Sequence, residues 1–379
     1  MKIASNFFVR GAIARGVITL LASAGALTSA AFAGDASPRT VDLGHFDEAT
    51  AWNQSLSAYN RAVDFIDNDT VVVGLVYDNP SPALSDRRNP RAGPHLFGIS
   101  TIDFATGAVT AREMLGNAEI GRNATLFGLG NGRLVVSMHN RVRAYNRALH
   151  EVWQLAIDDD TYLQASANRK NFYLWSPASE AQQPKYELQI FSTTKLEPEE
   201  TLALNAQPLS SMGRNVLAAH GAAGVYLYRG ESTERVISIN AQTTTCRPGP
   251  RPKRLISRGI LVDCNGILVL TDLDGRALAE RWLENKEIGR VETSADTNRI
   301  AVLTYKVASP ASLRDTSSAQ RDVEIVVLDG SLRPVHRIAP LGTGITPVFA
   351  LSPDGTRLAY LSEKTLALIE IPKGTASER

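Results

Sequence analysis

Cysteine is scarce in this chain of 379 residues, which has only Cys246 and Cys264. The two do not form a C-x-x-C motif, so the sequence indicates neither a zinc site nor a dithiol redox centre. Charge of one sign is also lacking, because 40 basic residues face 39 acidic ones. With no basic stripe and no polybasic run, the composition does not suggest binding to nucleic acid or to a membrane surface.

The motifs of common enzyme classes are absent as well. The chain has no G-x-S-x-G elbow, no H-E-x-x-H pair, no P-loop and no dinucleotide-binding fingerprint. Three histidines, His95, His139 and His220, follow similar apolar runs but have no consistent carboxylate partner. The sequence therefore predicts no metal site, no cofactor and no catalytic residue.

The first 33 residues are typical of a secretory signal. Three basic residues flank or precede a short apolar stretch at 17–27, and residues 31–33, Ala-Phe-Ala, form a small-x-small cleavage site. Cleavage there would change the net charge from +1 to −2, because the leader carries three basic and no acidic residues. We expect a periplasmic or secreted protein with no transmembrane span after cleavage, an uncleaved anchor being the alternative.

An oxidising compartment changes the expectation for the two cysteines. An even pair in an exported protein favours a disulfide between Cys246 and Cys264. Two free, buried thiols are the alternative.

Strand signals dominate the rest of the chain. Residues 348–372 hold three short apolar runs, the first ending in the turn signal Ser352-Pro353-Asp354-Gly355. Fainter copies of this pattern, each with four strands, recur six times from residue 62 onward, most weakly at residues 208–239. Grouping in fours favours a propeller over two packed sandwiches.

The last of these units lacks a fourth strand, while an unpartnered alternating segment lies at residues 40–46. Because a propeller must close its ring, we expect residues 40–46 to pair with residues 366–371. The sequence thus predicts an all-β fold, a seven-bladed β-propeller of residues 34–379 closed by an N-terminal strand. Six or eight blades are the alternative, since the fourth unit is faint.

The segment Ser352-Pro353-Asp354-Gly355, followed two residues later by Leu358-Ala359-Tyr360, resembles the SPDG-x-x-LAY signature of WD40-like and TolB-like bacterial propellers. The match is close only in this last unit. The resemblance implies the propeller fold, and it does not choose among scaffolds, ligand-binding proteins, quinoprotein dehydrogenases and peptidase propellers.

Three long connections should rise from one face of such a ring, at residues 78–95, 176–185 and 307–321, because each joins the second strand of its unit to the third. Long loops on a rigid scaffold often bind partners. The first loop is rich in proline and carries Arg87, Arg88, Arg91 and His95, which we take as the candidate binding residues. An arginine cluster suits an acidic partner.

The most economical functional interpretation is a non-catalytic platform that binds an unidentified protein or peptide. The alternative is an enzyme with a site at the mouth of the central channel, such as a quinoprotein-like oxidoreductase or a lyase.

Overall fold

The computed structural model describes residues 38–43, 62–78, 95–118, 124–138, 140–178, 186–219, 225–229, 233–236, 251–284, 287–307, 320–339, 348–362 and 365–372. Contacts divide the chain into two units, Met1–Asp35 and Ala36–Arg379, and every described residue belongs to the second unit. The predicted signal at residues 1–33 therefore lies outside the described residues.

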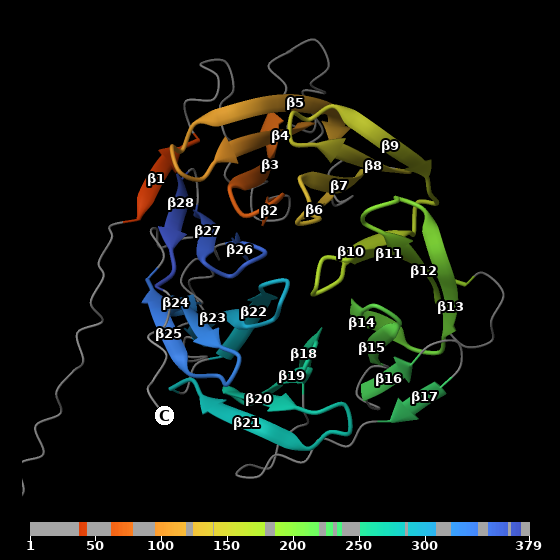
Figure 1. Ribbon diagram of the computed structural model, residues 1–379, viewed down its shortest axis with the longest axis vertical. Coiled ribbons are helices and arrows are strands. Elements are labelled where there is room, and N and C mark those ends of the chain that lie inside the picture. The colour runs from red at the N-terminus through yellow and green to blue at the C-terminus, as the bar shows by residue number, and fades with distance from the viewer. Residues whose placement is uncertain are drawn as a thin grey trace, which may run out of the picture. The chain divides into compact units, whose positions relative to one another are not determined.

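Seven four-stranded antiparallel sheets build the second unit, and Figure 1 shows them as blades around a common centre. From the innermost strand outward, blade one is β2 (Ala62–Phe65), β3 (Thr70–Asp78), β4 (His95–Asp103) and β5 (Val109–Ala118); blade two is β6 (Thr125–Gly128), β7 (Arg133–Met138), β8 (Arg141–Asn146) and β9 (Glu151–Ala156); blade three is β10 (Tyr162–Ala165), β11 (Asn171–Pro177), β12 (Tyr186–Ser192) and β13 (Pro198–Leu204).

The remaining blades repeat this order. Blade four is β14 (Gln207–Met212), β15 (Asn215–Ala219), β16 (Val225–Arg229) and β17 (Thr233–Val236); blade five is β18 (Arg251–Ile256), β19 (Gly259–Cys264), β20 (Ile267–Thr271) and β21 (Ala277–Trp282); blade six is β22 (Glu287–Thr293), β23 (Arg299–Val307), β24 (Gln320–Asp329) and β25 (Pro334–Ile338); blade seven is β26 (Val348–Leu351), β27 (Arg357–Ser362), β28 (Thr365–Glu370) and β1 (Arg39–Asp42). The seven-bladed prediction is confirmed, including the faint fourth unit, and six or eight blades are excluded.

The N-terminal strand closes the ring as predicted. β1 pairs antiparallel with β28, placing Thr40 opposite Ala367 and Asp42 opposite Thr365. Arg39 also donates to the backbone carbonyl of Phe104 in blade one at 2.8 Å. One short strand therefore supplies the outer edge of the last blade and a hydrogen bond to the first.

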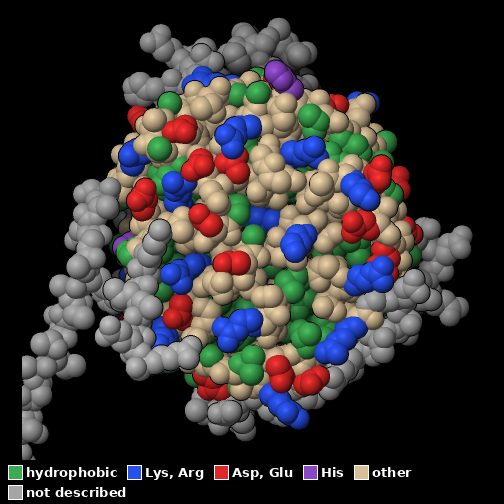
Figure 2. Space-filling model, viewed as in Figure 1, with side chains coloured by type: hydrophobic (Ala, Val, Ile, Leu, Met, Phe, Trp, Pro, Cys, Tyr) green, Lys and Arg blue, Asp and Glu red, His purple; other side chains and the backbone are tan. Residues whose placement is uncertain are grey.

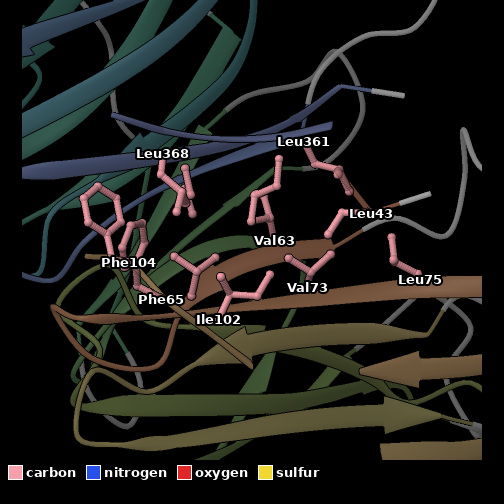
Figure 3. Packing of buried hydrophobic residues seen from close by; sticks show 13 residues of the cluster. Leu43, Val63, Phe65, Val73, Leu75, Ile102, Phe104, Leu361 and Leu368 are labelled. Atoms are coloured by element: carbon pink, nitrogen blue, oxygen red, sulfur yellow. The ribbon is translucent and has the colours of Figure 1, made fainter. Parts of the chain in front are cut away.

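Apolar side chains fill the space between neighbouring blades, as Figure 3 shows for blades one and seven. Val63 and Val73 from blade one meet Leu361 and Leu368 from blade seven, and Leu43, just after β1, joins the same cluster. Because both faces of each sheet are covered, the middle strands are almost continuously apolar. Each buried aliphatic side chain contributes about 2 kcal/mol to folding.

The turn between the first and second strands of blade seven has the geometry that its sequence indicates. Ser352 Oγ donates to Asp354 Oδ1 at 2.6 Å and accepts from the amide of Arg357 at 3.0 Å. Gly355 takes a φ of 71°, which glycine adopts without strain.

The same turn recurs in two blades whose sequences hide it, so the motif is not confined to the last unit as the sequence suggested. In each case a serine hydroxyl contacts the side chain two residues later, and the next residue has positive φ. The serine and the positive-φ residue are Ser166 and Arg169 in blade three, Ser294 and Thr297 in blade six, and Ser352 and Gly355 in blade seven.

Antiparallel pairing sorts the connections onto two faces of the ring. The turn face carries the links from first to second and from third to fourth strands, such as residues 166–170. The loop face carries the links from second to third strands and the links between blades, such as residues 157–161.

Candidate functional site

A single arginine spans the centre of the ring at the turn face. Arg169, in the turn between β10 and β11, donates through Nη1 to the carbonyls of Phe65 at 2.8 Å and Gly128 at 2.9 Å. Through Nη2 it donates to Asp64 Oδ1 at 2.7 Å and to the carbonyl of Leu351 at 3.1 Å. One side chain from blade three therefore binds blades one, two and seven. Figure 2 shows basic and acidic side chains interspersed over the face of the ring that it views.

The acidic partner of Arg169 is held equally firmly. Asp64 Oδ1 also accepts from the amide of Phe65, and Oδ2 accepts from the amide of Gly128, both at 2.8 Å. The Arg169 and Asp64 side chains are only 9% and 11% exposed. A carboxylate whose oxygens are bound in this way joins blades together and is not presented to a substrate.

A second charged cluster lines the inner strands of blades five and six. Glu292 on β22 lies 2.9 Å from Arg254 on β18 and 2.7 Å from Arg290 on its own strand. Burial acts to raise the pKa of the Glu292 carboxyl, but the charges of Arg254 and Arg290 outweigh it and lower that pKa. Glu292 is therefore held ionised, which is unsuited to a general acid at neutral pH.

The loop face has a different character, with a groove of about 860 Å³ between blades two and three. Its walls come from the turn after β7, the link from β9 to β10, the end of β11 and the start of β12. A second hollow of about 440 Å³ adjoins it and shares four of its lining residues, Ile157, Asp158, Ser176 and Glu187.

Carboxylates dominate the charge of this groove. Asp158, Asp159, Asp160 and Glu187 line it and are exposed, and no lysine or arginine is among the described residues that line either hollow. The link that carries the three aspartates is fixed at its start, because the amide of Ile157 donates to the carbonyl of Asn140 at 2.9 Å. Residues 158–160 thus belong to a polar link between blades two and three.

Three aromatic rings lie at the same end of blade three. Tyr162 on β10 stacks on Trp175 on β11, with ring centroids 4.3 Å apart and planes 17° from parallel. Tyr186 on β12 meets Trp175 edge-on at 5.7 Å. Trp175 and Trp282 both fall on strands expected from the sequence, which predicts that they pack between blades. Trp175 does so and is 8% exposed, whereas Trp282 is 56% exposed on the outermost strand of blade five, so that prediction is wrong. Tyr162 is 53% exposed.

Most of the binding residues predicted from the sequence are not described by the structure. Arg87, Arg88 and Arg91 lie outside the described residues, and His95 is the first residue of β4, opposite Asp78, with its side chain not described. Their role stays a prediction.

The predicted disulfide also involves a residue that the structure does not describe. Cys264 is buried at the end of β19, while Cys246 lies outside the described residues, so their pairing stays a prediction.

Sequence reasoning missed both the groove and Arg169. The groove is assembled from four segments of two blades, and its only signal in the sequence is the run of three aspartates. Arg169 occupies a position where the turn rule expects glycine, so the pattern gave no reason to single it out.

Within the described ranges, no three histidine, cysteine, aspartate or glutamate side chains gather in a way that could hold a metal ion. The same ranges contain no helix with the length and apolar character needed to cross a membrane.

Solved structures with a similar fold are known, whereas sequence comparison finds no match. No protein-family model matches the chain, and no curated protein matches it. A structure of Raptor from Chaetomium thermophilum is similar over 86% of this chain, with 13% identity and a TM-score of 0.53, although the match spans only 29% of the Raptor chain.

A chain of the Mitotic Checkpoint Complex is similar over 88% of this chain and 93% of its own length, with 14% identity and a TM-score of 0.51. The C-terminal WD40 domain of Sif2 is also found, with 11% identity, 83% and 97% coverage and a TM-score of 0.49. At these identities the likeness to Raptor and to the Mitotic Checkpoint Complex chain shows a shared fold alone. The bacterial TolB-like resemblance is not confirmed.

Proposed function

We propose that this protein is a non-catalytic platform that binds a protein or peptide on the loop face of its propeller. The observation that carries the proposal is the groove of about 860 Å³ between blades two and three, which opens on that face. Its volume is that of a small-molecule pocket, roughly 300–1,000 Å³, and so gives room for one or two side chains of a peptide. At the turn face, by contrast, Arg169 and its partners occupy the centre of the ring.

The charged residues near the centre support a platform over an enzyme. Asp64 is bound by Arg169 and by the amides of Phe65 and Gly128, and Glu292 is bound by Arg254 and Arg290. Such mutually compensated pairs join blades together. No observation specifically favours a site of oxidation or elimination at the centre of the ring.

Two finer parts of the proposal rest on the sequence. We place the protein in the periplasm or outside the cell because residues 1–33 are typical of a cleaved signal. We also keep the loop at residues 78–95 as a contributor to binding, because it concentrates Arg87, Arg88 and Arg91 beside prolines on the same face. A propeller of similar fold is part of the Mitotic Checkpoint Complex, which agrees with a role in protein assembly.

A face-specific crosslinking experiment tests the platform. A photo-crosslinking amino acid is placed at Asn140, beside the groove, or at Ser331, an exposed turn residue on the opposite face, in the protein expressed in its native host. Discrete adducts identified by mass spectrometry from Asn140 and not from Ser331 are expected. Adducts of equal yield from both positions, or none from Asn140, would overturn the proposal.

The contribution of the loop is tested separately. Residues 81–94 are replaced by a short Gly/Ser connection, and the fold is checked by circular dichroism. We expect the Asn140 adducts to weaken in the replaced protein. Undiminished adducts from a folded variant would show that the loop is dispensable.

A further inference from the structure

We propose that the loop-face end of blade three binds a basic segment of a polypeptide partner, one cationic side chain entering the groove and a second lying on the ring of Tyr162. This inference rests on the proposed function and names the chemistry of its partner.

The exposed ring of Tyr162 is the first observation that supports a basic partner. Packing explains why Trp175 is buried, but it does not explain why a second ring is stacked flat on it with 53% of its surface in solvent. A ring held in a fixed orientation by a neighbour loses little entropy when a ligand covers it. The exposed face of such a ring attracts a guanidinium or an ammonium group.

The negative charge of the groove is the second observation, and it favours a cationic occupant. All four of its ionisable lining residues are carboxylic, and they border a hollow large enough for a long side chain and part of its backbone. Lysine and arginine have the matching charge, and their long stems can lie against the apolar part of the wall, which includes Ile157 and Pro177. An acidic segment would instead meet repulsion along the whole groove.

The spacing of the two features defines the segment further. Leu174 and Ser176 line the hollows on one side of β11, so Trp175 between them faces the other side of the sheet. The groove and the Tyr162 ring therefore lie on opposite faces of blade three, at its loop-face end. A segment that crosses this end must present a basic side chain to each face. In an extended chain, residues i and i+3 point to opposite sides and are separated by roughly 10 Å, at about 3.3 Å per residue.

Peptide binding to the purified propeller tests this directly. The probe is a capped, fluorescein-labelled Gly/Ser octapeptide with arginines at positions 3 and 6, followed by fluorescence polarisation at about 0.1 M salt, where the Debye length is about 10 Å. Matched probes carry glutamates at the same positions, or the two arginines side by side.

The protein variants separate charge from stacking. In the groove variant, Asp158→Asn, Asp160→Asn and Glu187→Gln remove three exposed carboxylates. A charge-matched control removes three exposed carboxylates elsewhere, by Glu113→Gln, Glu197→Gln and Glu370→Gln.

For the ring, Tyr162→Ala is compared with Tyr162→Phe, which keeps the stacked surface. All of the substituted residues are exposed, so each variant should fold. Thermal melting checks this.

The arginine probe is expected to bind the native protein more tightly than both matched probes. Its Kd should rise about fivefold or more in the groove variant, since three exposed charge contacts are each modest. It should stay within about twofold in the charge-matched control, where only long-range charge changes. Tyr162→Ala should weaken binding and Tyr162→Phe should not.

Several results would overturn the inference: no preference for arginine over glutamate, equal loss in the groove variant and its control, or no effect of Tyr162→Ala. If Asn140 still gives discrete crosslinks while the arginine probe shows no preference, the platform stands and the basic partner is wrong. If Asn140 gives no crosslinks, the proposed function itself fails.

Discussion

Replacing Arg169 with alanine should destabilise the propeller by about 4 kcal/mol. Removing one partner of a buried ion pair costs about 3–5 kcal/mol, because the other charge is left without compensation. Here the remaining charge is Asp64, whose side chain is 11% exposed. The same change also removes the only side chain that donates to the carbonyls of Phe65, Gly128 and Leu351 in the hydrogen bonds described above.

The backbone conformation of Arg169 provides an internal check on this reasoning. Its φ of 56° lies in the left-handed region, which costs an L-residue about 1–2 kcal/mol. Alanine keeps that cost and glycine does not. Arg169→Gly should therefore be less destabilising than Arg169→Ala by about 1 kcal/mol, the reverse of the order expected in a helix or strand. Arg169→Lys keeps the charge but not the fork of donors, and should fall between native protein and alanine.

Urea unfolding of the purified proteins, followed by tryptophan fluorescence and circular dichroism, measures these differences. The double variant Arg169→Ala/Asp64→Asn should lose less stability than the sum of the two single changes, since the residues contact each other. A loss below about 1 kcal/mol for Arg169→Ala, or strict additivity of the pair, would refute the view that this ion pair joins four blades.

Three further predictions concern the ring itself. Thiol titration of the denatured, unreduced mature protein should find no free thiol, because Cys246 and Cys264 are expected to form a disulfide worth about 3 kcal/mol in the chain-entropy model; two reactive thiols would contradict it. Gly128→Ala should destabilise strongly, since the added Cβ would lie 1.9 Å from the carbonyl oxygen of Phe65, and a melting temperature equal to that of the native protein would contradict this. Deleting residues 34–46 removes β1, so size-exclusion chromatography should reveal aggregation through the exposed edge of β28, and a monodisperse monomer would contradict this.

The sequence was sufficient for the fold because each blade repeats one local rule. Buried middle strands require apolar runs, and tight turns require residues such as Ser352, Asp354 and Gly355, so both leave a readable trace. Even the closing strand was predicted from a shortage, one missing partner in the last unit, although it begins at Arg39 and not at Thr40.

The site was less accessible to sequence reasoning for two physical reasons. The groove depends on which blades are neighbours and how their links are spaced, and neither is encoded in a local pattern around Asp158 or Glu187. The turn of blade three was hidden because tertiary hydrogen bonds offset the strain of a positive φ at Arg169, so the glycine that the rule expects is not needed.

Stability and recognition are separated along the length of one strand. Arg169 follows the end of β10 at the turn face, whereas Asp158 and Asp160 precede its start at the loop face. Four residues of strand span roughly 13 Å, beyond the range at which mutational effects usually couple. Changes at the two ends should therefore act independently. Arg169→Lys should lower stability and leave peptide affinity unchanged, while the groove variant should lower affinity and leave stability unchanged. Coupling between them in a combined variant would mean that binding alters the packing of the blades, and that the propeller is more than a rigid support.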